Sequence, residues 1–438
     1  MPLHELSRAE PNKLFSITII IFFADIQPAL SLLLENRENL PWFLSPIECR
    51  NHGEHKSRFP VAQNSRDIMV TSSGLIDVVV PLWLEGLARE QMASGLLLQE
   101  STSRMIAGFS VGLEVWNRVL HAGTLYDRMI CDKLKKGSYG ENLAMELLID
   151  DARYAADLLR PVFEHSRGRD GWVILPVSPM LLNDATETVE AATMLHAETG
   201  RENIMISIPG LPHRLPVIQR LSATGIPVHI CMIFSQVQFC SAVQTCLEAI
   251  ETRIAAGLQP ISACCLTIPV DRLFAGLCFL FSEEVAVELT NAVIAEISET
   301  ADNLGSSRKW GRAVAAGAQL PRLIWSFAEN PDRCRSSFSL VRELGGTCSV
   351  VPRAGDAVST LSLLDPVKNE QSSAGRGPRQ GSLYPAHVDI DFIAFAGRLQ
   401  KNQAELWLRS WIGLLDTIAR KSAALTIGQS AKATGEDL

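Results

Sequence analysis

The amino-acid sequence predicts an α/β protein with the architecture of an eight-stranded barrel. From residue 75 onward, short apolar runs rich in Val and Ile alternate with amphipathic segments of helical period. The alternation extends over roughly 280 residues, which is the length of chain that eight strand and helix units require. A doubly wound open sheet of similar size would give the same local pattern.

The apolar runs have the length of buried strands, and most of them carry β-branched residues. They span residues 75–84, 105–111, 172–178, 204–208, 228–234, 261–268, 323–327 and 347–351. Between them, the clearest helical patterns cover residues 141–165, 236–256 and 282–304. Strand and helix therefore alternate in the order that a barrel needs.

The barrel is predicted to span residues 72–368, preceded by an extension over residues 1–70 that is either disordered or a targeting segment. Its apolar run 14–24 resembles the core of a signal peptide, but it is shorter than the roughly 20 residues of a membrane helix. A buried or partner-facing strand, and a start codon placed too early, are the alternatives for this run.

The region after the barrel divides into a linker, helices and a tail. Residues 369–385 are polar and rich in glycine, which is typical of a linker. Residues 386–424 are expected to form C-terminal helices that pack on the barrel, because Trp407, Trp411 and Leu414 recur at helical spacing. Residues 425–438 remain as a tail.

Composition narrows the classes of partner. The chain has 438 residues, 47% of them hydrophobic, and its net charge of -8 comes with scattered Lys and Arg, so neither nucleic acid nor a membrane span is predicted. Its 10 cysteines form no C-x-x-C pair, so a cytoplasmic location is expected, with targeting as the minor alternative. No metal and no cofactor is predicted, since the sequence has neither a metal-ligand pattern nor a glycine-rich phosphate loop. The expected partner is a small molecule, and the oligomeric state is left open.

Several segments carry a family resemblance. They are residues 155–171, 202–210, 225–235, 310–317 and 410–416, and the second reads Glu202-Asn-Ile-Met-Ile-Ser-Ile-Pro-Gly210. In this order and spacing they resemble the longer bacterial transaldolases, and the resemblance covers residues 72–424. It implies a (β/α)8 barrel of the transaldolase type and a sugar-enzyme ancestry.

The resemblance also implies a changed active site. Ser207 stands where the family has the lysine that forms a Schiff base with the substrate, and no lysine occurs between Lys136 and Lys309. A hydroxyl cannot condense with a ketose carbonyl to an imine. Glu85, after Trp-Leu on the first strand, replaces the family's proton-shuttling aspartate.

Further positions matched to the family suggest a drier pocket. Gly112 replaces an asparagine of the family and Pro176 a glutamate, and Phe327 stands where the family has a small polar segment. Cys264 and Pro269 were matched to a phosphate-binding serine and arginine. Together with Trp325, these six residues form the predicted substrate-binding set, and they favour a ligand less polar than a sugar phosphate.

Four side chains are the candidate catalytic group. His229 and Cys231 replace the family's Asn and Thr, and residues two apart on a strand face the same side, so both should face the barrel interior near Ser207 and Glu85. An imidazole beside a thiol can generate a thiolate, and a carboxylate can move protons. The plainer alternatives are a packed Cys231 and a His229 that is simply hydrogen-bonded.

Three functions follow from these observations, and we favour the first. The first is a repurposed enzyme of the lyase, isomerase or cyclase type that uses proton transfer on a small molecule in accessory metabolism. The second is a noncatalytic relative that binds a metabolite or protein, with a pocket filled by Phe109, Trp325 and Phe327. The third is residual transaldolase activity through a distant lysine.

Overall fold

The structure is a computed structural model. It describes residues 68–70, 76–78, 82–86, 89, 92 and 106–435, with gaps at 182–183, 261–262, 328–333, 345 and 351–389. The predicted extension, apart from residues 68–70, and the predicted linker lie outside the described residues. The chain divides into two units, Met1–Asn64 and Ser65–Leu438, and the second contains every element described below.

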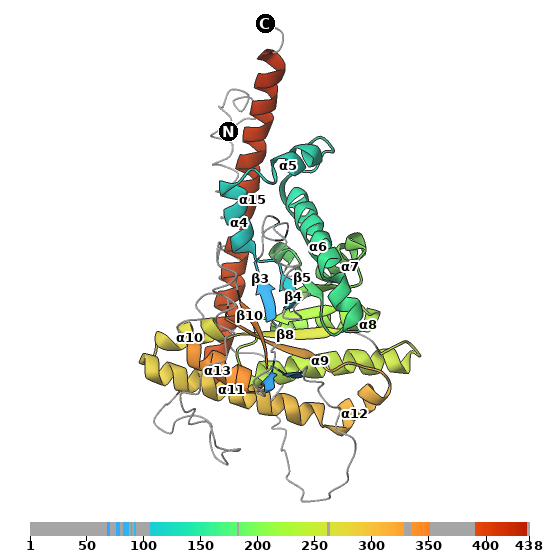
Figure 1. Ribbon diagram of the computed structural model, residues 1–438, viewed down its shortest axis with the longest axis vertical. Coiled ribbons are helices and arrows are strands. Elements are labelled where there is room, and N and C mark those ends of the chain that lie inside the picture. Colours follow the sequence, from blue (N-terminus) through green and yellow to red (C-terminus); the bar gives the residue numbers. More distant parts are fainter. Residues whose placement is uncertain are drawn as a thin grey trace, which may run out of the picture. The chain divides into compact units, whose positions relative to one another are not determined.

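The described strands close into a parallel barrel in the order β10-β3-β4-β5-β6-β7-β8-β9 (Figure 1). The eight predicted runs correspond to these eight strands, so the barrel prediction is confirmed and the open sheet is excluded. Their bounds are β3 (Leu82–Glu85), β4 (Ile106–Ser110), β5 (Trp172–Pro176), β6 (Ile204–Pro209), β7 (Val228–Cys231), β8 (Cys264–Pro269), β9 (Arg322–Ser326) and β10 (Thr347–Val350). The run 75–84 also contains β2 (Ile76–Val78), which pairs antiparallel with β1 (Ile68–Val70).

Helices follow the strands and cover the outside of the barrel. The three predicted helices appear within a residue of the expected bounds, as α6, α9 and α11. The helices are α4 (Leu113–Ala122), α5 (Asp127–Leu134), α6 (Gly140–His165), α7 (Ala185–Thr199), α8 (Leu215–Thr224), α9 (Gln236–Ala255), α10 (Val270–Cys278), α11 (Glu283–Gly305), α12 (Arg308–Ala315), α13 (Arg335–Glu343) and α15 (Phe392–Gly435). None of the described helices is long and apolar enough to cross a membrane.

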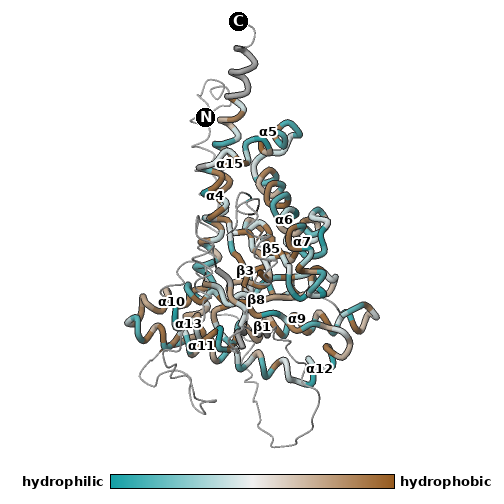
Figure 2. Tube along the Cα trace, in the orientation of Figure 1, coloured by the Kyte–Doolittle hydropathy of each residue, from teal (hydrophilic) through white to brown (hydrophobic). Residues whose placement is uncertain are grey.

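A cluster of apolar side chains, here called the apolar plug, fills the barrel interior near the amino-terminal ends of the strands. Its members pack as one cluster, separate from the larger core between strands and helices, and comprise Trp83, Ala107, Trp172, Ile174, Met205, Ala263, Cys265 and Ile324. Residues between them in the strands point outward to the helices, as the alternation of a pleated strand requires. Figure 2 shows the resulting pattern, with hydrophobic strands and a hydrophilic α5. The inward-facing positions at the carboxyl ends of the strands, such as Glu85 and Ser207, lie beyond this cluster.

The last helix begins beside the barrel and continues along the helices that follow β4. α15 contacts α4, α5 and α6 (Figure 1). The predicted C-terminal helices are thus one continuous helix, which runs from Phe392 to Gly435 and includes much of the predicted tail. No proline occurs after residue 385 to end it.

A buried carboxylate ties the segment after β3 to α6. Asp151 is 3% exposed and accepts hydrogen bonds from Arg89 Nε at 2.8 Å, from Trp116 Nε1 at 3.0 Å and from the Tyr126 hydroxyl. Burial is the main cause that raises the pKa of Asp151. Arg89 comes four residues after Glu85, so this cluster fixes the chain as it leaves β3.

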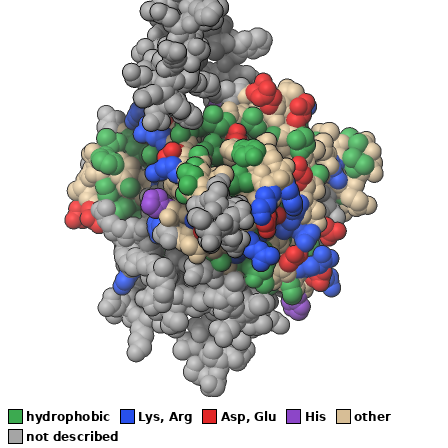
Figure 3. All heavy atoms as spheres, turned by 90° about the horizontal axis from the view of Figure 1, so that it is seen from above, with side chains coloured by type: hydrophobic (Ala, Val, Ile, Leu, Met, Phe, Trp, Pro, Cys, Tyr) green, Lys and Arg blue, Asp and Glu red, His purple; other side chains and the backbone are tan. Residues whose placement is uncertain are grey.

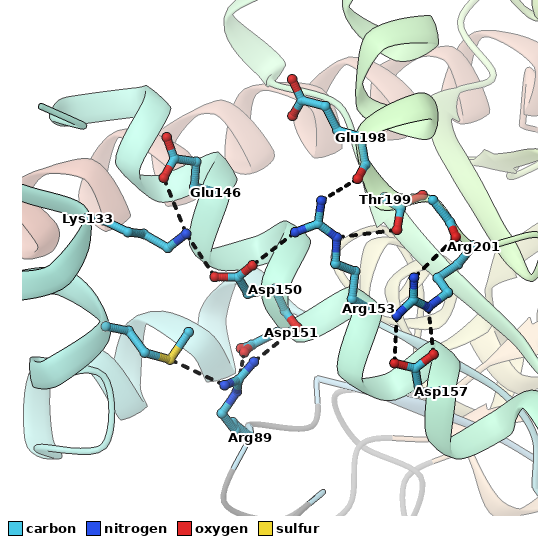
Figure 4. Close-up of polar contacts among 12 residues, drawn as sticks. Arg89, Lys133, Glu146, Asp150, Asp151, Arg153, Asp157, Glu198, Thr199 and Arg201 are labelled. Carbon is cyan, nitrogen blue, oxygen red and sulfur yellow. Dashed lines mark hydrogen bonds and ion pairs between the residues drawn. The ribbon is translucent and has the colours of Figure 1, made fainter. Parts of the chain in front are cut away.

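The outer face of α6 carries a row of ion pairs (Figure 4). Asp150 pairs with Lys133 of α5 at 2.8 Å, and Asp157 pairs with Arg201 at 2.6 Å. The more exposed pair of Asp157 and Arg201 contributes roughly 0.2–1 kcal/mol. The part-buried pair of Lys133 and Asp150 joins α5 to α6. On the face seen in Figure 3, basic and acidic side chains likewise lie next to one another.

We expect Gly108→Ala to lower the free energy of unfolding by roughly 1–3 kcal/mol. A Cβ at Gly108 would lie 2.6 Å from the ring of Trp83, which is part of the plug and cannot move aside. Urea unfolding monitored by circular dichroism measures the change. Gly311→Ala is the matched control, because nothing lies within 4 Å of its Cβ and the helix should gain up to about 1 kcal/mol. Equal stability of Gly108→Ala and the native protein would contradict the plug.

Candidate active site

Polar side chains line the barrel interior at the carboxyl ends of the strands. All but Cys231 lie two residues beyond a member of the apolar plug, or beside such a residue in register, and therefore face the same interior. Cys231 lies two residues beyond His229 on the same strand and faces the same side. They are Glu85, Ser110, Ser207, His229, Cys231, Thr267 and Ser326. This end of a (β/α)8 barrel is where active sites occur.

A hydrogen-bonded chain crosses three neighbouring strands, from β6 through β7 to β8. Ser207 Oγ lies 2.8 Å from His229 Nδ1, and His229 Nε2 lies 2.8 Å from Thr267 Oγ1. Ser207 and His229 are register partners on β6 and β7, which brings their side chains together. The structure thus unites three of the four predicted catalytic residues, because Cys231 Sγ lies 3.7 Å from Ser207 Oγ.

The donor and the acceptor of each hydrogen bond between Ser207, His229 and Thr267 can be assigned. Ser207 donates its proton to Cys231 Sγ, so its oxygen accepts from His229 Nδ1–H. His229 Nε2 then accepts from the Thr267 hydroxyl. This assignment makes His229 the Nδ1–H tautomer, and it leaves the Ser207 proton on a weak sulfur acceptor.

The fourth residue, Glu85, lies at the end of β3. Its Oε1 accepts a hydrogen bond of 2.7 Å from Ser326 Oγ, on β9. Its negative charge contributes to raising the pKa of Cys231, after the larger effect of burial, so the carboxylate and the thiol are close. The four predicted residues therefore occupy one interior site.

Burial keeps the imidazole and the thiol uncharged. Burial lowers the pKa of His229 to about 3 and raises the pKa of Cys231 to about 11. At neutral pH the site therefore holds a neutral imidazole and a protonated thiol. This electrostatic state favours the plainer interpretation of Cys231 over a nucleophile.

Three of the predicted substrate-binding residues lie at the same end of the barrel. Pro176 and Pro269 are the last residues of β5 and β8, and Gly112 precedes α4. A Cβ at Gly112 would lie 2.7 Å from the Cα of Gly86, so the loops after β3 and β4 meet here at a distance that only glycine permits. Pro176 is the register partner of Ser207.

The other three do not face the interior, and their assignment to the pocket is wrong. Cys264 begins β8 at the far end of the barrel, and its sulfur lies 2.9 Å from that of Cys246 in α9. Trp325 and Phe327 pack outward, with the Phe327 ring 5.1 Å from that of Phe338 in α13. Phe109 also belongs to the outer core. The expected dry pocket depended partly on these residues, whereas the interior side chains are mostly hydroxylated.

Sequence reasoning missed Thr267, Ser326 and Ser110. Residues two apart on a strand face the same side, and this spacing on the other predicted strands indicates these three residues as well. The resemblance places the family's phosphate site at Cys264 and Pro269. Because Cys264 lies at the opposite end of β8, that match gives no support for a lost anion site.

No group of three or more His, Cys, Asp or Glu side chains suited to a metal ion occurs among the described residues. The polar residues of the site come instead as an imidazole, a thiol, a carboxylate and four hydroxyls. Such groups can donate and accept hydrogen bonds, and a carboxylate can in addition accept a proton.

Comparison with known proteins shows what this barrel is similar to. A family model described as Transaldolase/Fructose-6-phosphate aldolase matches residues 116–264. A transaldolase of Thermobifida fusca is 29% identical over 374 residues, which cover 80% of this chain and 98% of that protein. Transaldolase 1 of Streptomyces avermitilis is 27% identical and covers 79% and 94% respectively. The chain is similar to these transaldolases over most of its length.

Among solved structures, a putative fructose-1,6-biphosphate aldolase from Coccidioides immitis aligns with 12% identity and a TM-score of 0.31, over 78% of this chain and 93% of that one. The transaldolase relatives extend over most of the barrel, so the family resemblance seen in the sequence is confirmed. None of the eight described barrel strands contains a lysine.

We expect stability to fall on acidification because of His229. The unfolded imidazole has a pKa of about 6.5 and the folded one about 3, so between these values the unfolded state binds more protons and stability rises with pH. From about pH 6 to about pH 4.5 the native protein should lose up to about 1.4 kcal/mol per pH unit from this residue. His229→Gln should show a shallower loss in urea unfolding, and identical slopes would contradict a buried neutral imidazole.

Proposed function

We propose that this chain is an enzyme that catalyses proton transfer on a small hydroxylated carbonyl compound without a Schiff base. The observation that supports the proposal is the interior chain Thr267–His229–Ser207 with the Glu85 carboxylate nearby. A repacked interior without function has no need for so many polar groups, since each buried one must be hydrogen-bonded.

Glu85 is the proton acceptor in this proposal. Its carboxylate takes a proton from the carbon next to the substrate carbonyl, the C–H electrons form a C=C bond, and the carbonyl electrons move to oxygen. The resulting enolate oxygen accepts the Ser207 hydroxyl proton as a hydrogen bond. Protonated Glu85 then returns its proton to a carbon of the enolate, so the step is balanced and leads to exchange or isomerisation.

Ser207 and His229 supply the electrophilic side. Because the Ser207 proton is bonded only to a sulfur 3.7 Å away, a carbonyl oxygen can replace that acceptor at little cost. The neutral His229 supports the hydroxyl from the other side by donating Nδ1–H. A preorganised donor aimed at developing negative charge is an effective form of catalysis.

The replacement of the Schiff-base lysine by Ser207 separates this proposal from the activity named for the relatives. No lysine is available on the strands to form an imine, and Lys133 and Lys421 of the surrounding helices are engaged in ion pairs. A noncatalytic binding role and a residual transaldolase activity are the alternative outcomes of the experiments below.

Borohydride reduction tests the missing Schiff base. With fructose 6-phosphate and borohydride, we expect the native protein to gain no covalent adduct by intact mass spectrometry, because a hydroxyl forms no imine. Ser207→Lys restores an amine at the same interior position, and a new adduct in this variant alone would locate the ancestral site. An adduct on the native protein would establish a working lysine elsewhere and overturn the proposal.

Deuterium exchange tests proton transfer directly. In D₂O, the protein should introduce deuterium next to the carbonyl of a member of a panel of dihydroxyacetone, fructose and fructose 6-phosphate, observed by proton NMR. Glu85→Gln should reduce the rate by roughly 10²–10⁴-fold, because an amide cannot accept the proton. Glu284→Gln, at the exposed start of α11, is the control and should keep the native rate. No exchange with any compound would favour the noncatalytic alternative.

A further inference from the structure

A buried glutamine of α15 joins the ends of β6 and β7, the strands that carry Ser207, His229 and Cys231. Gln400 is 3% exposed, and its Nε2 donates to the carbonyl oxygen of Gly210 at 2.8 Å and to that of Met232 at 3.0 Å. Gly210 directly follows β6, and Met232 directly follows β7. One amide group thus satisfies two buried carbonyls of different strands.

Met232 has an unusual backbone that makes this contact necessary. Its φ is +63°, in the left-handed region that costs a residue with a side chain roughly 1–2 kcal/mol. The Cys231 carbonyl still accepts from Gly210 N at 2.8 Å, so the strand pairing ends here and the chain turns at Met232. The turn removes the Met232 carbonyl from the ladder, and Gln400 provides its donor. Strained backbone of this kind persists only where surrounding contacts hold it.

The surroundings allow little movement of this junction. A Cβ on Gly210 would lie 2.5 Å from Ile233 Cδ1, so the ends of β6 and β7 are in close contact. The helix is held on both sides of Gln400. Leu399 packs against Gly276 of α10, and Trp411 Nε1 donates to Glu141 Oε1 at 3.0 Å.

We propose that Gln400 is a positioning residue that couples the docking of α15 to the hydrogen-bonded chain of the site. Cys231 is adjacent to Met232, and Ser207 lies three residues before Gly210, so a shift of either strand end moves the Ser207 and His229 side chains relative to each other. Gln400 touches no reacting atom in this role. Its effect on proton transfer rests on the proposed function, whereas its effect on the positions of Ser207 and His229 does not.

The imidazole of His229 reports this coupling. In protein labelled with ¹⁵N-histidine, the native His229 signals, assigned with His229→Gln, should show the Nδ1–H tautomer throughout the neutral range. Gln400→Met keeps much of the side-chain volume but removes both N–H donors, and we expect it to give mixed tautomer signals. Hydrogen exchange at the Gly210 amide should rise at least about 10-fold, because its bond to Cys231 depends on the same junction.

A matched variant separates positioning from stability. Trp411→Phe removes another hydrogen bond of α15 and should lower the melting temperature while the native His229 signals persist. Native His229 signals in Gln400→Met, or equal changes in both variants, would overturn the positioning role. Gln400-dependent His229 signals in a protein without deuterium exchange would overturn only the proposed function. Deuterium exchange with His229 signals that do not depend on Gln400 would overturn only the positioning role.

Discussion

The structure depends on the closure of a parallel ladder in which every strand has one face inside and one face outside. Once β10 pairs with β3, the ring has no edge, and each strand must fill the interior with alternate side chains. Large apolar side chains such as Trp83 and Met205 fill the lower part. The next inward positions, among them Glu85 and Ser207, then meet at the carboxyl end of the barrel, and this placement does not depend on the sequence of the surrounding helices. Site and plug are two consequences of the same alternation.

The same alternation decides how much the sequence could predict. Strand length and β-branched composition were sufficient for all eight barrel strands, because buried parallel strands leave a strong local signal. The constellation of Ser207, His229 and Cys231 followed from strand pairing alone. The prediction that Trp325 and Phe327 line the pocket was wrong because the family resemblance compares residue types at each position. It does not show whether a side chain faces the barrel interior or the helices. Ile324 faces the interior, so the residues one and three positions later, Trp325 and Phe327, face outward.

Contacts between distant segments were beyond the sequence. Gln400 lies 190 residues after Gly210, and nothing in the composition of a C-terminal helix indicates which polar residue will turn inward. The left-handed Met232 was equally hidden, since methionine has no preference for that conformation. The Asp151 cluster, which joins Arg89, Trp116 and Tyr126, is a third case. Such long-range polar contacts arise because buried donors and acceptors must find partners in the finished packing.

The position of Ser207 shows how a small polar side chain fits between two neighbouring strands of the barrel. Ser207 is a register partner of both Pro176 and His229, so a smaller side chain there opens no gap in the ladder itself. A lysine at this position would project an ammonium group past His229 toward the carboxyl end of the barrel, whereas the hydroxyl stops within hydrogen-bonding distance of the imidazole. Ser207 and His229 therefore form a hydrogen-bonded pair inside the barrel. That pair keeps an interior polar group in place, on which proton-transfer chemistry by Glu85 can depend.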